Sequence, residues 1–266
     1  NDRTIIAKGK TDGFGYARVE NLEKEIYSIT FPFFDSHAIK YLDNQKVAPD
    51  SLTGKEEPAI SNYKVKQGDC LQSIAYEHGF FWETIWNHTN NAELRTKRPD
   101  PNLLFPGDIV FIPPKKEKQV ICCTGQQHRF RIKGRKTKLN ILLRIEGEAL
   151  AKTDFTITID GENINGKTDL KGRISQYISP SAKNAKLRLE INGDEYTLVL
   201  GGMDPITEII GIQARLANLG FPLSVTGKWD SKSINAIKRF QNHYQLEVTG
   251  RIDQPTRNKL MEVYGF

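Results

Sequence analysis

The chain has few cysteines and no long apolar run, and these absences exclude several classes of protein. Three of its 266 residues are cysteine, and two of them, Cys122 and Cys123, are adjacent and poorly placed to pair with each other. A disulfide framework is therefore excluded, and without a CxxC pair we expect no zinc site of that kind. Because no apolar run is long enough to cross a bilayer, we expect no membrane insertion.

Sequence signatures of catalysis are also missing. The chain has no GxSxG, no HExxH and no glycine-rich phosphate loop. Asp12 and Asp169 occupy matching places in a short repeat, but neither has an acidic companion at a spacing useful for glycan hydrolysis. We therefore predict that the chain is not an enzyme and needs no cofactor or metal. Any catalytic domain would precede residue 1.

The stretch 63–113 has the most distinctive pattern. It opens YKVKQGDCLQSIA and closes PNLLFPGDIVFIP. Its first residues alternate as a strand, a Gly-Asp turn interrupts them, and apolar residues then recur at helical spacing. A second short helix carries two tryptophans, and a long loop at 87–101 precedes the final strand. The predicted order of elements is βααβ.

This stretch resembles the LysM family, whose members bind N-acetylglucosamine-containing polymers such as peptidoglycan or chitin. The resemblance implies a shallow groove, in which turn backbone groups fix the sugar and apolar side chains cover its faces. The implied groove residues are Gly68, Asp69, Cys70 and Leu71 on one side and Asn102, Leu103, Leu104, Phe105 and Pro106 on the other. The alternative is a spacer module whose groove binds nothing.

The C-terminal stretch 204–266 has the apolar period of three helices. Asp204-Pro205 is a cap followed by proline, which predicts the start of the first helix. Gly220 would end that helix, Thr226-Gly227 predicts a turn, and Asp253 is predicted to cap the last helix.

The segments IIGIQARLANLGF, INAIKRFQNHYQLEVTG and IDQPTRNKL resemble the three-helix peptidoglycan-binding domain found beside many wall hydrolases. The resemblance implies a shallow cleft between helices that holds glycan or stem peptide. Polar or aromatic candidates for this site are Gln213, Lys228, Trp229 and Gln241. For the two glutamines there is an alternative, that they satisfy each other or backbone groups.

Between these stretches, residues 118–200 alternate apolar and polar residues in short runs. Three dipeptides are hairpin signals: Asp160-Gly161, Asn165-Gly166 and Asn192-Gly193. Alternation with frequent turns predicts a sandwich of two antiparallel sheets.

A short repeat links this region to the N-terminus. GKTDLKGRI at 166–174 echoes GKTDGFGYA at 9–17. In each copy we expect the aspartate to accept backbone N–H bonds in a turn, while the glycine three residues later takes a positive φ. The pattern resembles carboxypeptidase-regulatory-like or other Ig-like modules used as rigid spacers. The first copy has too few strands for a sandwich, so we expect the chain to be part of a longer protein.

The predicted fold class is multidomain α+β, divided into five segments. They are a partial Ig-like β-sandwich at 1–34, a linker at 35–62, the LysM-like module at 63–114, an Ig-like β-sandwich spacer at 115–203 and a three-helix bundle at 204–266.

The net charge of +6 is more than a neutral glycan requires. The densest basic run comprises Arg129, Arg131, Lys133, Arg135, Lys136 and Lys138. Cell-wall polyanions would explain it, and nucleic acid is the rival ligand. Because the run has no recognised nucleic-acid fold and no interleaved aromatic residue beyond Phe130, we do not expect nucleic acid as a partner.

The order of modules resembles accessory proteins encoded beside the spike proteins of type VI and related contractile secretion systems. We therefore predict a non-catalytic protein that binds peptidoglycan in the periplasm or cell wall, with a secretion spike or effector as a further partner. The alternative is a protein–protein adaptor or immunity-like component with no glycan affinity. Its support is the loops 87–101 and 32–50, whose aromatic and charged residues suit a partner surface.

Overall fold

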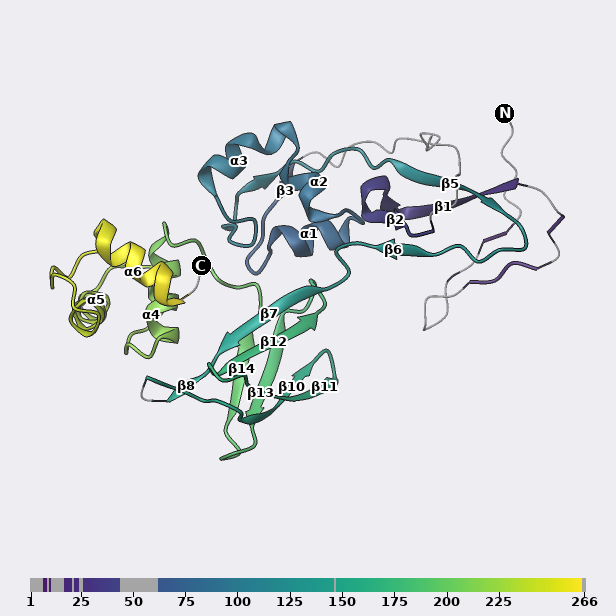
Figure 1. Cartoon of the computed structure of the whole chain (residues 1–266). Coiled ribbons are helices and arrows are strands. Elements are labelled where there is room, and N and C mark those ends of the chain that lie inside the picture. Colours follow the sequence, from purple (N-terminus) through teal and green to yellow (C-terminus); the bar gives the residue numbers. More distant parts are fainter. Residues whose placement is uncertain are drawn as a thin grey trace.

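The computed structural model describes residues 7–8, 10, 17–20, 22–23, 26–43, 62–145 and 147–264. In this part of the chain six α-helices and fourteen short strands form a mixed α+β protein (Figure 1). Buried apolar side chains gather into three separate cores, within residues 65–112, 155–200 and 212–260. The chain is thus built from small units, each with its own core. The division predicted at residues 34, 62, 114 and 203 stays a prediction.

The first unit, at 63–112, contains the predicted elements. β3 (Tyr63–Lys64) pairs antiparallel with β4 (Ile109–Val110), and α1 (Leu71–Glu77) and α2 (Trp82–Trp86) lie between them in sequence. α1 begins where the Cys70 backbone N–H donates to the Ser73 hydroxyl, a cap that satisfies one of the free amides at the helix start.

The segment 87–101, predicted as a loop, also contains helix. A 3-10 turn, η2 (Thr89–Asn91), leads into α3 (Ala92–Lys97). Asn91 holds the turn, because its Nδ2 donates to the Ile85 and Phe111 carbonyls and its Oδ1 accepts from the Phe111 N–H, each at 2.8 Å. Apolar periodicity does not reveal such a side chain, and the expectation of a plain loop is wrong.

The N-terminal residues pair with the chain that follows this unit. β1 (Ile26–Asp35) pairs with β5 (Glu117–Cys123), and after η1 (Ser36–Ala38), β2 (Ile39–Tyr41) pairs with β6 (Phe130–Ile132). These strands form a long ribbon at the end of the molecule away from the C-terminal helices (Figure 1). Most of the first repeat copy at 9–17, with Asp12, and of the linker at 35–62 lies outside the described residues.

Two antiparallel sheets share the second core and form the sheet unit, at 137–200. One has the order β11-β10-β13-β14 and the other pairs β12 with β7, while β8 and β9 form a separate small hairpin. Their bounds are β7 (Thr137–Leu142), β8 (Arg144–Ile145), β9 (Glu148–Ala149), β10 (Asp154–Ile159), β11 (Glu162–Lys167), β12 (Arg173–Ile178), β13 (Asn184–Leu189) and β14 (Glu195–Val199). The apolar residues of their inner faces pack together, as alternation predicts.

Two of the three hairpin predictions are confirmed. Asp160-Gly161 joins β10 to β11, and Asn192-Gly193 lies in the turn between β13 and β14. The prediction at Asn165-Gly166 is wrong, because both residues lie inside β11. A Cβ at Gly166 would lie 2.8 Å from the Phe155 ring, so this glycine makes room for a cross-strand aromatic side chain.

The repeat turn at 169–172 forms as predicted. The Asp169 carboxylate accepts the backbone N–H groups of Lys171 and Arg173, both at 2.8 Å, and Gly172 has a φ of 74°. These backbone hydrogen bonds lower the pKa of Asp169.

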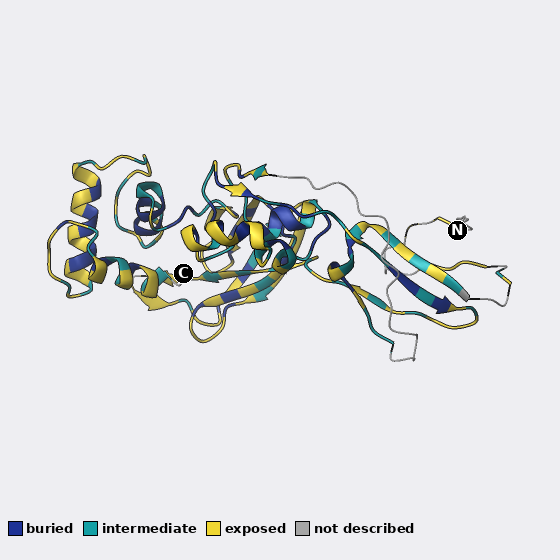
Figure 2. Cartoon of the chain, turned by 90° about the horizontal axis from the view of Figure 1, so that it is seen from above, coloured by how far each residue is buried: buried dark blue, intermediate teal, exposed yellow. Residues whose placement is uncertain are grey.

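The C-terminal unit, or helical unit, has three helices, α4 (Ile209–Asn218), α5 (Ser231–His243) and α6 (Gln254–Tyr264). Figure 2 shows their buried inner faces and exposed outer faces. The predicted cap is confirmed at Asp253, which accepts the Thr256 N–H at 2.9 Å. The predicted helix start at Asp204-Pro205 is wrong, because α4 begins at Ile209. The buried Asp204 side chain is instead hydrogen-bonded to Gln67 of the first unit.

A buried ion-pair network joins the first unit to the helical unit. Arg98, 4% exposed, donates from Nε to Asp108 at 2.8 Å and from Nη1 to Glu208 and Thr207, each at 3.0 Å. Burial opposes ionisation of Asp108, but hydrogen bonds from Arg98, Lys97 and the Phe105 backbone outweigh it and lower the pKa of Asp108.

Removal of the Asp108 charge should destabilise the chain in a pH-dependent way. Asp108→Asn leaves Arg98 buried without its main partner, so we expect a loss of about 3–5 kcal/mol at pH 7. Because the folded-state pKa of Asp108 is below the 3.8 of an unperturbed aspartate, this contribution is present above pH 3.8 and disappears as the pH falls through the folded pKa. Calorimetric unfolding of both chains between pH 7 and pH 2 measures it.

The matched control is Asp154→Asn, which breaks the exposed pair between Lys167 and Asp154. Exposed pairs contribute about 0–1 kcal/mol, so this variant should unfold almost like the parent. A gap between Asp108→Asn and the parent that stays constant down to pH 2 would contradict the role of this carboxylate.

Candidate functional site

The two sides of the groove implied by the LysM resemblance lie against each other. The Leu71 N–H donates to the Pro101 carbonyl at 3.0 Å, which ties the start of α1 to the 100–106 loop. The Gly107 N–H donates to the Val65 carbonyl at 2.9 Å and holds the other end of that loop beside β3. Residues thirty or more positions apart are thus brought together by backbone hydrogen bonds.

The nine implied groove residues differ in accessibility. Leu71 and Leu104 are buried in the core of the unit and cannot contact a ligand without unfolding. The other residues are partly or fully exposed: Gly68, Asp69, Cys70, Asn102, Leu103, Phe105 and Pro106. The surface that a sugar could touch is therefore formed by one turn and by the side chains of the 102–106 loop.

The polar groups of the 66–70 turn are already engaged within the chain. Asp69 accepts the Tyr63 hydroxyl and the Lys66 N–H, both at 2.9 Å. Burial, followed by this contact with Asp69, raises the pKa of Tyr63 to about 12. Lys183 of the sheet unit donates to the Gly68 carbonyl at 2.8 Å and lies 3.5 Å from Asp69. A sugar that used these two polar groups would have to displace Lys183.

In the helical unit, Gln213 and Gln241 are both fully buried and hydrogen-bonded to turns. Gln213 Oε1 accepts the N–H groups of Thr226 and Gly227 at 2.9 and 2.8 Å, and its Nε2 donates to the Lys228 carbonyl at 2.8 Å. Gln213 therefore satisfies backbone groups of a turn, which is the alternative to ligand binding given for the two glutamines above.

Gln241 repeats this arrangement one helix later. Its Oε1 accepts the Gly250 N–H at 2.8 Å, and its Nε2 donates to the Arg251 carbonyl at 3.0 Å. The sequence also indicates that the two turns correspond, although the family motif does not. TGKWDSKS at 226–233 and TGRIDQPT at 249–256 share one spacing of Thr-Gly, a basic residue, Asp and Ser or Thr. The two buried glutamines therefore position two equivalent turns.

Each turn presents an exposed basic residue beside a different apolar partner. Lys228 and Arg251 are exposed, Trp229 is 44% exposed, and Ile252 at the matching place packs on the helical core. The first turn thus combines a cation with an accessible aromatic ring, and the second does not. Of the four predicted candidates in this unit, Lys228 and Trp229 are accessible to a ligand.

Among the described residues, no group of three or more His, Cys, Asp or Glu side chains is arranged to hold a metal ion. Nor does any helix in that part of the chain combine the length and apolar character needed to cross a membrane.

Comparison with known families identifies the helical unit. Residues 207–260 match the family model of a putative peptidoglycan binding domain, and the match covers α4, α5 and most of α6. No significant match was found among curated proteins or among solved structures. The C-terminal unit therefore has the sequence character of a peptidoglycan-binding domain, in agreement with the resemblance seen in its helical segments.

The buried glutamines should matter for stability rather than for direct ligand contact. Gln241→Leu leaves the Gly250 N–H and the Arg251 carbonyl without this partner, and each unsatisfied buried group costs about 1–3 kcal/mol. We expect the variant to lose more than about 2 kcal/mol and its Gly250 amide to exchange hydrogen faster. Urea unfolding and residue-resolved hydrogen exchange measure these effects.

Trp229→Ala is the control within the same unit, and an exposed substitution of this kind changes stability by about 0.5 kcal/mol or less. Unchanged exchange at Gly250 in Gln241→Leu would show that the glutamine does not hold its turn.

Proposed function

We propose that this chain binds peptidoglycan without cleaving it, through its C-terminal helical unit. The observation that carries the proposal is the match of residues 207–260 to the putative peptidoglycan binding domain. The accessible pair of Lys228 and Trp229 supports it, because an aromatic face can cover a sugar ring while an ammonium group meets acidic groups of the wall.

The unit at 63–112 would supply a second, LysM-like contact with the same polymer. In support, its strands and first two helices follow the predicted βααβ order, with α3 added before the last strand, and the two implied sides of the groove lie together. Two weak sites on one chain gain from effective concentration, so polymeric wall would be bound far more tightly than a short oligosaccharide. Because Lys183 contacts Gly68 and Asp69, the Asn102 and Leu103 side of the groove would contribute most.

A protein with this activity would work in the periplasm or cell wall. We further propose that it is delivered with, or docked to, a spike or effector of a contractile secretion system. The order of modules along the sequence supports this second step.

The rival function is an adaptor that binds only protein. One of the two loops that favour it in the sequence is the segment 87–101, as a partner surface. In the structure Arg98 of this segment is buried against the helical unit, and Arg95 donates to the carbonyls of Trp86 and His88. Because these long side chains already bind within the chain, they favour a structural role for the segment.

Co-sedimentation of the full chain with purified peptidoglycan sacculi tests the proposal. We expect binding that persists at high salt. We expect Lys228→Ala with Trp229→Ala to lower the apparent affinity, and Asn102→Ala with Leu103→Ala to do the same. Loss of either member of a bivalent pair can cost on the order of 10²-fold or more.

Lys186→Ala, an exposed substitution on β13, is the control and should sediment like the parent. A parent chain that stays in the supernatant at low salt would exclude peptidoglycan binding and favour the adaptor. If only the first pair of substitutions weakens sedimentation, the helical unit binds the wall and the LysM-like unit acts as a spacer.

A further inference from the structure

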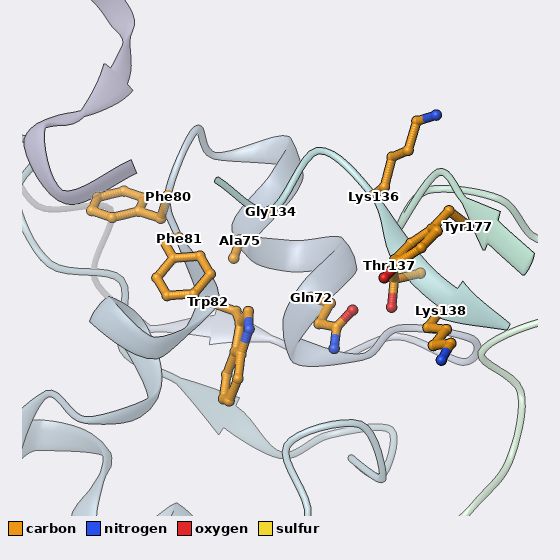
Figure 3. A pocket seen from close by; sticks show the side chains of 10 residues that line it. All are labelled: Gln72, Ala75, Phe80, Phe81, Trp82, Gly134, Lys136, Thr137, Lys138 and Tyr177. Carbon is orange, nitrogen blue, oxygen red and sulfur yellow. The ribbon is translucent and has the colours of Figure 1, made fainter. Parts of the chain in front are cut away.

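A cavity of about 270 Å³ lies where the first unit meets the sheet unit, apart from both sites described above. Figure 3 shows Trp82 and Gln72 on the helix side, with Tyr177, Thr137 and Lys138 facing them from the strand side. The helix side comes from α1 and α2, and the strand side comes from the paired strands β7 and β12. Both units are therefore needed to form it.

Cation–π contacts hold the turn between β6 and β7 against the helices. Lys133 Nζ lies 5.0 Å from the centre of the Phe81 ring, and the Arg135 guanidinium lies 4.9 Å from the centre of the Tyr76 ring. Gly134 between them has a φ of 72° and approaches Phe81 closely enough that a Cβ would lie 3.6 Å from the ring. Part of the basic run found in the sequence is thus used to build the wall of the cavity.

The cavity wall combines aromatic faces with hydrogen-bonding groups. The Trp82 ring is half-buried, whereas Tyr177 is 64% exposed, and a ring this exposed contributes little to the core and is free to contact a ligand. The Gln72 amide and the Thr137 hydroxyl can each both donate and accept a hydrogen bond. Aromatic faces with a few convergent polar groups are the usual composition of a small-molecule site.

The charge at the cavity has one sign. Lys136 and Lys138 are exposed and line it, and none of its described lining residues is acidic. Lys138 lies directly opposite Tyr177 in the strand register, so an ammonium group and an aromatic ring share one face. A ligand that fills this site should carry an anionic group next to an apolar face.

From these features we infer that the cavity binds one carboxylate-bearing sugar unit, an inference that rests on the proposed function of wall binding. The volume of about 270 Å³ is just below that of drug-sized ligand sites, which are roughly 300–1,000 Å³, so it suits a single pyranose ring. Tyr177 and Trp82 cover the faces of the ring, Gln72 bonds its hydroxyl or acetamido group, and Lys138, which shares the face of Tyr177, pairs with the carboxylate while Lys136 adds positive charge at the rim.

Titration of the full chain with N-acetylmuramic acid and with N-acetylglucosamine tests this inference, because the acid differs by its lactyl carboxylate. The readout is the indole N–H signal of Trp82 in a ¹H–¹⁵N spectrum. We expect the acid to bind roughly three- to tenfold more tightly at low salt, the preference that one or two exposed charge pairs provide. Lys136→Ala with Lys138→Ala should abolish the preference, and Tyr177→Ala should weaken both sugars.

Lys186→Ala, which changes a lysine remote from the lining residues, is the control and should keep the full preference. Equal binding of the two sugars, or no change in the Trp82 signal in a chain that does sediment with sacculi, overturns the inference and leaves the proposed function intact. Carboxylate-dependent binding in a chain that does not sediment supports the cavity and rejects the proposed function. Tighter, lysine-dependent binding of an oligothymidylate overturns the assignment in favour of nucleic acid.

Discussion

The buried Arg98 guanidinium is the interaction on which the arrangement of the chain depends. It lies between Asp108 at the end of the 100–106 loop and Glu208 just before α4, so one side chain serves two units. The same Asp108 carboxylate accepts the Phe105 N–H at 2.9 Å. The junction therefore also orders the loop that the LysM resemblance assigns to sugar contact. Since a buried charge is costly unless paired, these ion pairs fix the position of the two units relative to each other, and the units are not joined by a flexible linker alone.

This junction has a consequence for the first of the two implied binding sites. Lys183 and the buried Asp204 both reach the 66–70 turn, one through the Gly68 carbonyl and the other through Gln67. The turn is therefore preorganised by contacts from two other parts of the chain, which reduces the entropy lost on binding. The same contacts cover part of its polar surface, so the opposite loop is left as the open side of the groove.

Much of the fold could be predicted from the sequence, and the exceptions have physical causes. The helices at Leu71 and Trp82, the turn at Asp169 and the cap at Asp253 follow from apolar spacing and local side chain to backbone bonds. Gly166 and Asp204 were misassigned because a distant residue determines each: the Phe155 ring across the sheet and Gln67 in another unit. The cavity was missed for the same reason, since its two walls come from separate units.

The basic run at 129–138 shows how neighbouring residues of one charge can have different roles. Arg129 binds Asp43 at 2.7 Å, while Lys133 lies over the ring of Phe81 just before α2 and Arg135 lies over the ring of Tyr76 in α1. These three charges therefore serve the structure. Lys136 and Lys138 come next along the chain and line the cavity. A generally basic surface would attract any polyanion, including nucleic acid. With its charge beside aromatic rings in a site of single-sugar size, this surface instead favours ligands that present an anionic group and an apolar face together. Selectivity of that kind separates an acidic glycan from a polyanion recognised by charge alone.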